Sequence, residues 1–123
     1  MEKNVEISLL FGFYKNLLTA RQADTVDLYY NEDLSLAEIG EELGISRQGV
    51  RDNLKRAEQL LYDAEEKLGL AKRFIEIRGK LGEIDIMIKE IEGSAEANRL
   101  PADIRKKINA VLETLSDING LTE

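Results

Sequence analysis

Residues 34–55 read LSLAEIGEELGISRQGVRDNLK and predict two short helices joined by a tight turn. Ser35 and Glu38 have the spacing of a capping box, in which each side chain satisfies a free backbone N–H at the start of a helix. Gly44 stands where a residue with positive φ commonly ends a helix, and Ser46 can cap the helix that follows. These signals in this order are typical of a helix-turn-helix unit.

The same stretch contains the apolar residues that such a unit needs for its small core. Gly40 is small enough to let the two helices come into close contact, and Ile45 can fill the angle between them. The remaining expected core positions recur at helical spacing, and they are Leu36, Ile39, Leu43, Val50 and Leu54. The polar side chains of the second helix are then left facing outward.

These outward-facing side chains are the candidate contact surface. In a DNA-binding unit of this kind, the start of the second helix enters the major groove. Arginine suits guanine and glutamine suits adenine, whereas an aspartate accepts from cytosine but repels phosphate. The candidate nucleic-acid-binding residues are Ser46, Arg47, Gln48 and Asp52 nearest base edges, and Arg51, Lys55 and Arg56 nearer phosphates.

The composition of the 123-residue chain favours an all-α protein without a catalytic site. Apolar residues make up 43% and charged residues 33%, with one proline and no tryptophan, and leucine and isoleucine recur with helical spacing. The absence of cysteine and histidine removes disulfides, thiolate ligands, the usual zinc ligand and the usual general base at neutral pH. The pairs Glu41 with Glu42 and Glu65 with Glu66 are neighbours on exposed helix faces rather than convergent groups. We therefore expect no enzyme activity, no cofactor and no metal.

The charge distribution sets the second helix apart from the rest of the chain. The formal net charge of −7 is opposite to the basic balance expected of a protein whose main partner is a phosphate backbone. Residues 46–56 nevertheless carry four basic residues against one acidic residue. No apolar run reaches the roughly 20 residues of a membrane span, and MEKNVEISLL at the N-terminus contains no cleavage signal. We expect a cytoplasmic protein that does not insert into membranes.

Residues 5–18 predict a helix with a strongly apolar face. The aromatic residues Phe11, Phe13 and Tyr14 have helical spacing, which is more often found in a core than in a binding surface. The expected apolar stripe is Val5, Leu9, Phe13 and Leu17, with Leu10 and Leu18 beside it.

Residues 19–33 predict a second helix that helps to brace the helix-turn-helix unit. Thr19 and Gln22 form another capping box, and the helix that it opens should end at a turn over residues 31–33. Tyr29 and Tyr30 are adjacent and cannot both point inward, so we expect one of them to be exposed.

The second helix of the unit should continue to Gly69. Its apolar series runs on in steps of four and three through Val50, Leu54, Ala57, Leu61, Ala64 and Leu68. A second such series, typical of a helix–helix seam, is Leu70, Phe74, Ile77, Leu81, Ile84, Ile88 and Ile91. Gly79 and Gly82 lie inside this series, each weakening a helix by about 1 kcal/mol, and predict a kink or a close crossing. The strings FIEIRG and EIDIMI alternate somewhat like strands, so a short β-hairpin is the alternative.

The C-terminal part predicts a helical hairpin. Gly93 and Ser94 begin a polar break, and Pro101 suits the first turn of a last helix. The apolar positions of that helix are Ile104, Ile108, Val111, Leu115 and Ile118. We therefore divide the chain into a helix-turn-helix domain at residues 1–69 and a helical hairpin at residues 70–123. Apolar residues left over from the seams, Ile75, Ile86 and Met87, predict a homodimer formed through the hairpin.

The run TARQADTVDLYYNEDLSLAEIGEELGISRQGVRDNLKRAEQLL, residues 19–61, resembles the C-terminal promoter-recognition module of sigma-70 factors and, more closely, the small YlxM-like family. The resemblance covers roughly residues 5–75. It includes the threonine-capped helix, the Ser-Leu-Ala-Glu-Ile start, the Gly-Ile-Ser turn and the Ser-Arg-Gln-Gly-Val opening of the second helix. Asn53 departs from the sigma pattern, in which an aliphatic residue is usually buried there.

The resemblance implies a bacterial cytoplasmic protein that serves or regulates the signal recognition particle pathway. In the first hypothesis, the basic helix binds the RNA of the particle or its GTPase. In the second, the protein is a DNA-binding transcriptional regulator, and a dimer places two recognition helices at a half-site spacing of about 34 Å.

Overall fold

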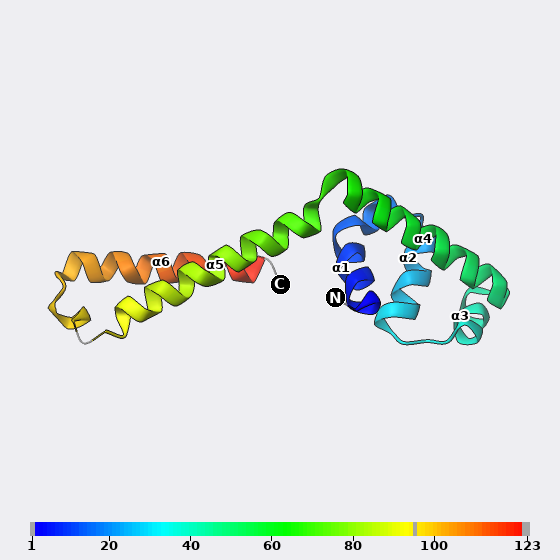
Figure 1. Cartoon of the computed structure of the whole chain (residues 1–123). Coiled ribbons are helices and arrows are strands. Elements are labelled where there is room, and N and C mark those ends of the chain that lie inside the picture. The colour runs from blue at the N-terminus through cyan, green and yellow to red at the C-terminus, as the bar shows by residue number, and fades with distance from the viewer. Residues whose placement is uncertain (1, 95, 122–123) are drawn as a thin grey trace. The chain divides into compact units, whose positions relative to one another are not determined.

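The protein is all-α in a computed structural model that describes residues 2–94 and 96–121 (Figure 1). This confirms the expected fold class, and the described residues contain no strand. Two compact units make up the chain, at residues 1–72 and 73–123. The division into domains at residue 69 stays a prediction.

The first unit consists of three shorter helices packed on one long helix (Figure 1). The helices are α1 (Lys3–Tyr14), α2 (Ala20–Val26), α3 (Leu36–Leu43) and α4 (Arg47–Leu68), with the single turns η1 (Lys15–Leu17) and η2 (Asp27–Asn31) after α1 and α2. The buried face of α4 consists of Val50, Leu54, Ala57, Leu61 and Ala64, as its apolar spacing predicts. The last residue of the predicted series, Leu68, is 51% exposed.

The predicted caps are present at the starts of α2 and α3. Thr19 accepts from the N–H of Gln22 (3.1 Å), and the Gln22 side chain accepts from the N–H of Thr19 (3.0 Å). Ser35 and Glu38 form the same reciprocal pair, at 3.1 Å in each direction. Gly44 ends α3 with a φ of 71°, the left-handed conformation that favours glycine.

The apolar stripe predicted for the first helix is wrong at its two ends, while Leu9, Phe13 and Leu18 pack against the core as expected. The buried residues of α1 are Ile7, Leu10, Phe11 and Tyr14, whereas Val5 and Leu17 are each more than half exposed. Strict steps of four residues drift by about 40° per step around a helix of 3.6 residues per turn, so the stripe rotates away from the core. The helix also ends at Tyr14, which leaves Leu17 in the single turn η1. The aromatic residues do belong to the core, where Phe11 and Tyr14 are buried and Phe13 is half-buried.

Glu65 and Tyr14 hold the junction that follows α4. Gly69 ends α4 with a φ of 63°. The Tyr14 hydroxyl donates to Glu65 Oε1 (2.6 Å) and accepts from the N–H of Leu70 (3.1 Å). The same carboxylate accepts from the N–H groups of Ala71 (3.0 Å) and Lys72 (3.1 Å), so it caps the first turn of α5 (Leu70–Glu92). The prediction that Glu65 lies on an exposed face is wrong.

The second unit is a helical hairpin formed by α5 and α6 (Ala102–Leu121), with the short turn η3 (Ala97–Arg99) between them. Both strings considered as strands, FIEIRG and EIDIMI, lie inside α5, so the β-hairpin alternative is wrong. A helix accommodates them because their apolar residues also recur at steps of three and four. A Cβ added at Gly79 or Gly82 would meet nothing within 4 Å, so neither glycine marks a close crossing.

Candidate nucleic-acid interface

A close backbone contact fixes the turn between α3 and α4. A Cβ added at Gly40 would lie 2.7 Å from the carbonyl oxygen of Ile45, so no other residue fits without a shift of the backbone. The N–H of Ile45 donates to the carbonyl of Gly40 (3.0 Å), which ties the turn to α3. Arg21 Nη1 donates to the carbonyl of Leu43 (3.3 Å) and holds the end of α3 from α2. These contacts set the angle at which α4 leaves the turn.

The first half of α4 presents a row of basic side chains. Ser46 caps the helix by accepting from the N–H of Gly49 (3.0 Å), so its hydroxyl is already engaged. Val50 and Leu54 are buried and determine which way the helix faces. The side chains on the opposite face are exposed, and Arg47, Arg51 and Lys55 follow one another at intervals of four residues along that face. We call these three residues the basic row.

Gln48 and Asp52 form a hydrogen-bonded pair beside the basic row. Gln48 Nε2 donates to Asp52 Oδ1 at 3.1 Å, and both side chains are exposed. The pair gives the aspartate a partner that the sequence analysis did not anticipate, although the spacing of four residues on a helix signals it. A base contact by the Gln48 amide has to share or replace this hydrogen bond.

Arg56 borders a groove as well as the other candidate side chains. It lines an open groove of about 670 Å³ together with Leu17, Leu60 and Leu68, on the flank of α4. Arg56 follows Asp52 by four residues, as Asp52 follows Gln48, so it continues the line of Gln48 and Asp52 beside the basic row. The structure therefore places all seven candidates on the exposed side of α4 or at its start. Ser46 is the cap, and the other six form two adjacent lines, Arg47, Arg51 and Lys55 in one and Gln48, Asp52 and Arg56 in the other.

Asn53, the departure from the sigma pattern, is half-buried beside the buried Leu54. The burial of Val50 and Leu54 is sufficient to turn the basic row outward.

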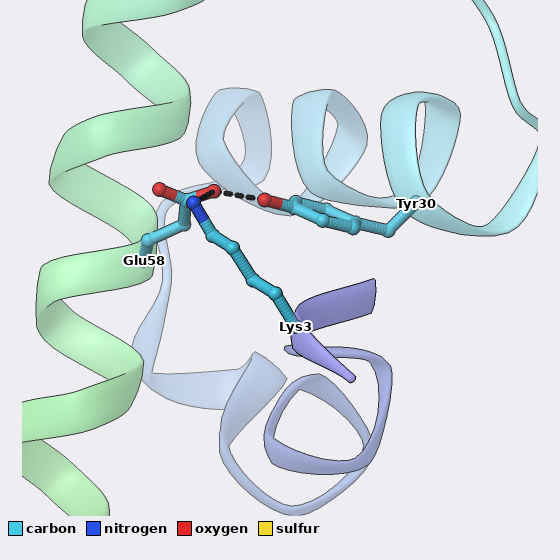
Figure 2. Close-up of polar contacts among 3 residues, drawn as sticks. All are labelled: Lys3, Tyr30 and Glu58. Atoms are coloured by element: carbon cyan, nitrogen blue, oxygen red, sulfur yellow. Dashed lines mark hydrogen bonds and ion pairs between the residues drawn. The ribbon is translucent and has the colours of Figure 1, made fainter. Parts of the chain in front are cut away.

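A polar cluster fastens α1 and η2 to α4. Figure 2 shows Lys3, Tyr30 and Glu58, in which the Tyr30 hydroxyl donates to Glu58 Oε1 and Lys3 Nζ lies 3.7 Å from the same oxygen. Burial raises the pKa of Tyr30, and the hydrogen bond to Glu58 raises it further, so the phenol stays protonated at neutral pH. Tyr29 is the exposed member of the tyrosine pair, and its ring packs edge-on against Tyr30.

A family model with the description "Putative helix-turn-helix protein, YlxM / p13 like" matches residues 1–111. The chain belongs to this family, UPF0122. The resemblance to the YlxM-like family is thereby confirmed, and the match includes most of the hairpin in addition to the helix-turn-helix unit.

Several UPF0122 proteins are similar to this chain over nearly all of its length. A UPF0122 protein of Acetivibrio thermocellus is 43% identical over 117 residues, covering 93% of this chain and all of the relative. One of Thermoanaerobacter pseudethanolicus is 47% identical over 113 residues, covering 92% of this chain and 93% of the relative. One of Desulforamulus reducens is 40% identical over 121 residues, covering 96% and 100%.

Within residues 2–94 and 96–121, the acidic side chains form no group of three or more that could hold a metal ion. In the same part of the chain, no helix combines the length and the apolar character needed to cross a membrane.

Proposed function

We propose that this UPF0122 protein is a non-enzymatic, cytoplasmic nucleic-acid-binding protein whose contact surface is the basic row of α4. The observation that carries the proposal is the alignment of Arg47, Arg51 and Lys55 on one exposed face, at the start of a helix whose direction the Gly40 contact fixes. Lysine and arginine side chains that neutralise phosphates supply most of the affinity of such proteins.

The net negative charge of the first unit supports a nucleic-acid contact that is restricted to the basic row. Residues 1–72 carry 9 basic and 14 acidic residues, so most of the unit repels a polyanion. Three of the nine basic residues belong to the basic row. A phosphate backbone is therefore attracted to one face of the unit and repelled by others, which orients the complex.

The family resemblance favours the signal recognition particle pathway as the setting. The first candidate ligand is the RNA of the particle, with the basic row on its phosphate backbone. The GTPase of the particle is the protein partner to test beside it, since an acidic surface would complement the same row.

Duplex DNA is the second candidate, and the helix-turn-helix geometry favours it. A recognition helix fits the major groove of B-form DNA, whereas the major groove of A-form RNA is too narrow for side chains to read. In this case Arg47 and Gln48 read base edges, and a homodimer contacts two half-sites.

A salt series with both ligands tests the proposal. We expect binding of the particle RNA or of promoter-containing duplex DNA that weakens as salt rises, and that Arg51→Glu with Lys55→Glu abolishes. The matched control is Lys15→Glu with Lys67→Glu, which makes the same change of charge at exposed positions of the same unit. Equal affinities of the two double variants would contradict the assigned surface.

Single substitutions separate the two candidates. Base reading predicts that Arg47→Ala and Gln48→Ala each cost about 1 to 3 kcal/mol on a preferred DNA sequence and little on other sequences. Binding that is confined to the particle RNA, with no preference among DNA sequences, would reject the regulator and leave the first candidate.

A further inference from the structure

Two rows of apolar residues spaced seven apart lie side by side on α5, and only one of them is covered. Phe74, Leu81 and Ile88 form the covered row and are half-buried. The other row lies three residues further along in each repeat, and its members Ile77, Ile84 and Ile91 are 59%, 40% and 47% exposed. Rows three residues apart are neighbours on a helix surface. The hairpin therefore covers one half of a heptad seam and leaves the other half open.

The opposing helix α6 repeats this arrangement. Ile108 is half-buried and Leu115 is buried, whereas Ile104 and Val111, each four residues earlier, are 37% and 39% exposed. Ile118 continues the open row seven residues after Val111 and is half-buried. Both helices thus carry an open row at the same offset from a covered row.

The two open rows lie on the same side of the hairpin. The helices α5 and α6 run in opposite directions (Figure 1). In both helices the open residue precedes a covered residue by four, and helix geometry turns equal offsets on two antiparallel helices toward the same side. Glu92 and Ile108 line one small cavity, which places the end of α5 beside the start of α6. Open residues of the two helices that are equally far from the turn in sequence are Ile77 and Ile118, Ile84 and Val111, and Ile91 and Ile104, and we call each such pair a layer. We call this surface the open face.

We propose that the open face is a dimerisation surface and that its occupant is the same face of a second copy of this chain. A two-fold axis that runs along the length of the hairpin places each layer opposite the same layer of the second copy. The apolar rows of the two copies then meet with identical spacing. Two antiparallel hairpins joined in this way form a four-helix bundle, the arrangement in which a heptad seam is covered on both halves. This proposal does not depend on which nucleic acid the first unit binds.

The size of the face is sufficient for a stable contact. The 20 residues of α6 span about 30 Å, and two helices side by side are about 20 Å wide, so each copy offers about 600 Å². Two copies would bury about 1,200 Å², above the roughly 1,000 Å² expected of a specific interface.

The charge balance also favours a second copy. Residues 73–123 carry 8 basic and 10 acidic residues, a net charge of −2, against −5 for residues 1–72. The near-neutral unit is therefore the one that can approach its own copy with little repulsion.

Sedimentation equilibrium of the full chain tests the proposal through the central layer. At tens of micromolar we expect wild type at about 28 kDa, twice the 13.9 kDa of one chain, and Ile84→Glu or Val111→Glu at 13.9 kDa with unchanged helical circular dichroism. Ile86→Glu is the matched control and should remain dimeric, because Ile86 is 59% exposed on the opposite side of the same helix. The proposed contact therefore does not include Ile86, which the sequence analysis counted among the residues that predict a dimer. A wild-type mass of 13.9 kDa would overturn the proposal, as would equal dissociation of the Ile84 and Ile86 variants.

Cross-linking provides a second test that does not require a charged substitution. The chain contains no cysteine, so Ile84→Cys and Ile86→Cys each carry a single thiol. With a short bismaleimide we expect Ile84→Cys to give a covalent dimer and Ile86→Cys to stay at the mass of one chain. Cross-linking that is equally efficient at both positions would show that the open face is not the contact.

Discussion

Gly40 is the position at which the first unit has no room for a side chain. We predict that Gly40→Ala destabilises the protein by about 1 to 3 kcal/mol, since the new Cβ would force the Ile45 carbonyl away and tilt α4. Urea unfolding would measure the loss. Gly12→Ala is the control, because that Cβ would meet nothing within 4 Å inside α1. It should raise stability by about 0.5 to 1 kcal/mol. A neutral Gly40→Ala would contradict the close contact.

The carboxylate of Glu65 makes the free energy of unfolding depend on pH. Burial raises the pKa of Glu65, but hydrogen bonds from Tyr14 and from the N–H groups of Ala71 and Lys72, together with the charge of Lys72, outweigh burial and lower the pKa below its usual value. The folded state therefore binds this proton less tightly than the unfolded chain does. The stability contributed by the carboxylate is present above about pH 4.5 and is lost as pH falls through the lowered pKa of the folded state.

We predict that Glu65→Gln lowers the unfolding free energy at pH 7 and reduces the loss of stability between pH 7 and acid. Urea titrations at a series of pH values would show this as a flatter dependence on pH. Glu66→Gln removes the same charge from an exposed neighbour and should leave the dependence as in wild type. Identical pH profiles for the two variants would mean that Glu65 does not cap α5.

At the scale of a helix, α4 carries two copies of the same side-chain pair in different settings. Gln48 donates to Asp52 beside the basic row, and Gln59 donates to Asp63 (2.9 Å) about three turns further along the helix. Only Asp52 places a negative charge among the side chains proposed to meet phosphate. The second pair is therefore an internal control for the first.

We predict that Asp52→Asn tightens nucleic-acid binding by about 0.5 to 1 kcal/mol at low salt, because it removes a like charge from the contact face and keeps a hydrogen-bond partner for Gln48. The gain should shrink as salt rises. Asp63→Asn should leave affinity unchanged. Fluorescence anisotropy on labelled RNA and duplex DNA would compare the variants, and an equal gain from both would indicate a general effect of net charge.

The elements of the first unit could be predicted because their signals are local. Ser35, Thr19, Gly44 and Ser46 act on backbone groups within a few residues, so sequence spacing alone identifies the helix ends. The stripe of α1 could not be predicted as easily, since Leu9, Leu10, Phe11 and Phe13 make its face apolar nearly all round. The positions of α4 and η2, which both pack against α1, decide which of these residues are buried.

The residues of the candidate site could be named from the sequence, but the contacts that surround them could be predicted only in part. Burial of Val50 and Leu54 turns the basic row outward, as their spacing predicts. Arg56 continues the line of Gln48 and Asp52, as its spacing of four residues predicts, whereas the groove that it also lines depends on residues distant in sequence such as Leu17. Glu65 was missed because its partner Tyr14 is 51 residues away.

At the scale of the whole molecule, binding through the basic row and dimerisation through the open face together predict that loss of the dimer weakens nucleic-acid binding. If the second unit holds two copies together, each complex offers two basic rows, and engagement of the second row becomes intramolecular.

We therefore predict an effect of Ile84→Glu on binding, although Ile84 is far along the chain from the basic row. The substitution should lower the apparent affinity for a ligand that spans both rows by about tenfold or more. The dependence of log affinity on log salt should also fall toward half of its wild-type slope, since half as many phosphates are neutralised. Ile86→Glu should keep both the affinity and the slope of wild type. An Ile84→Glu chain that sediments as a monomer and still binds with wild-type affinity and slope would show that one basic row suffices and that dimerisation serves another purpose.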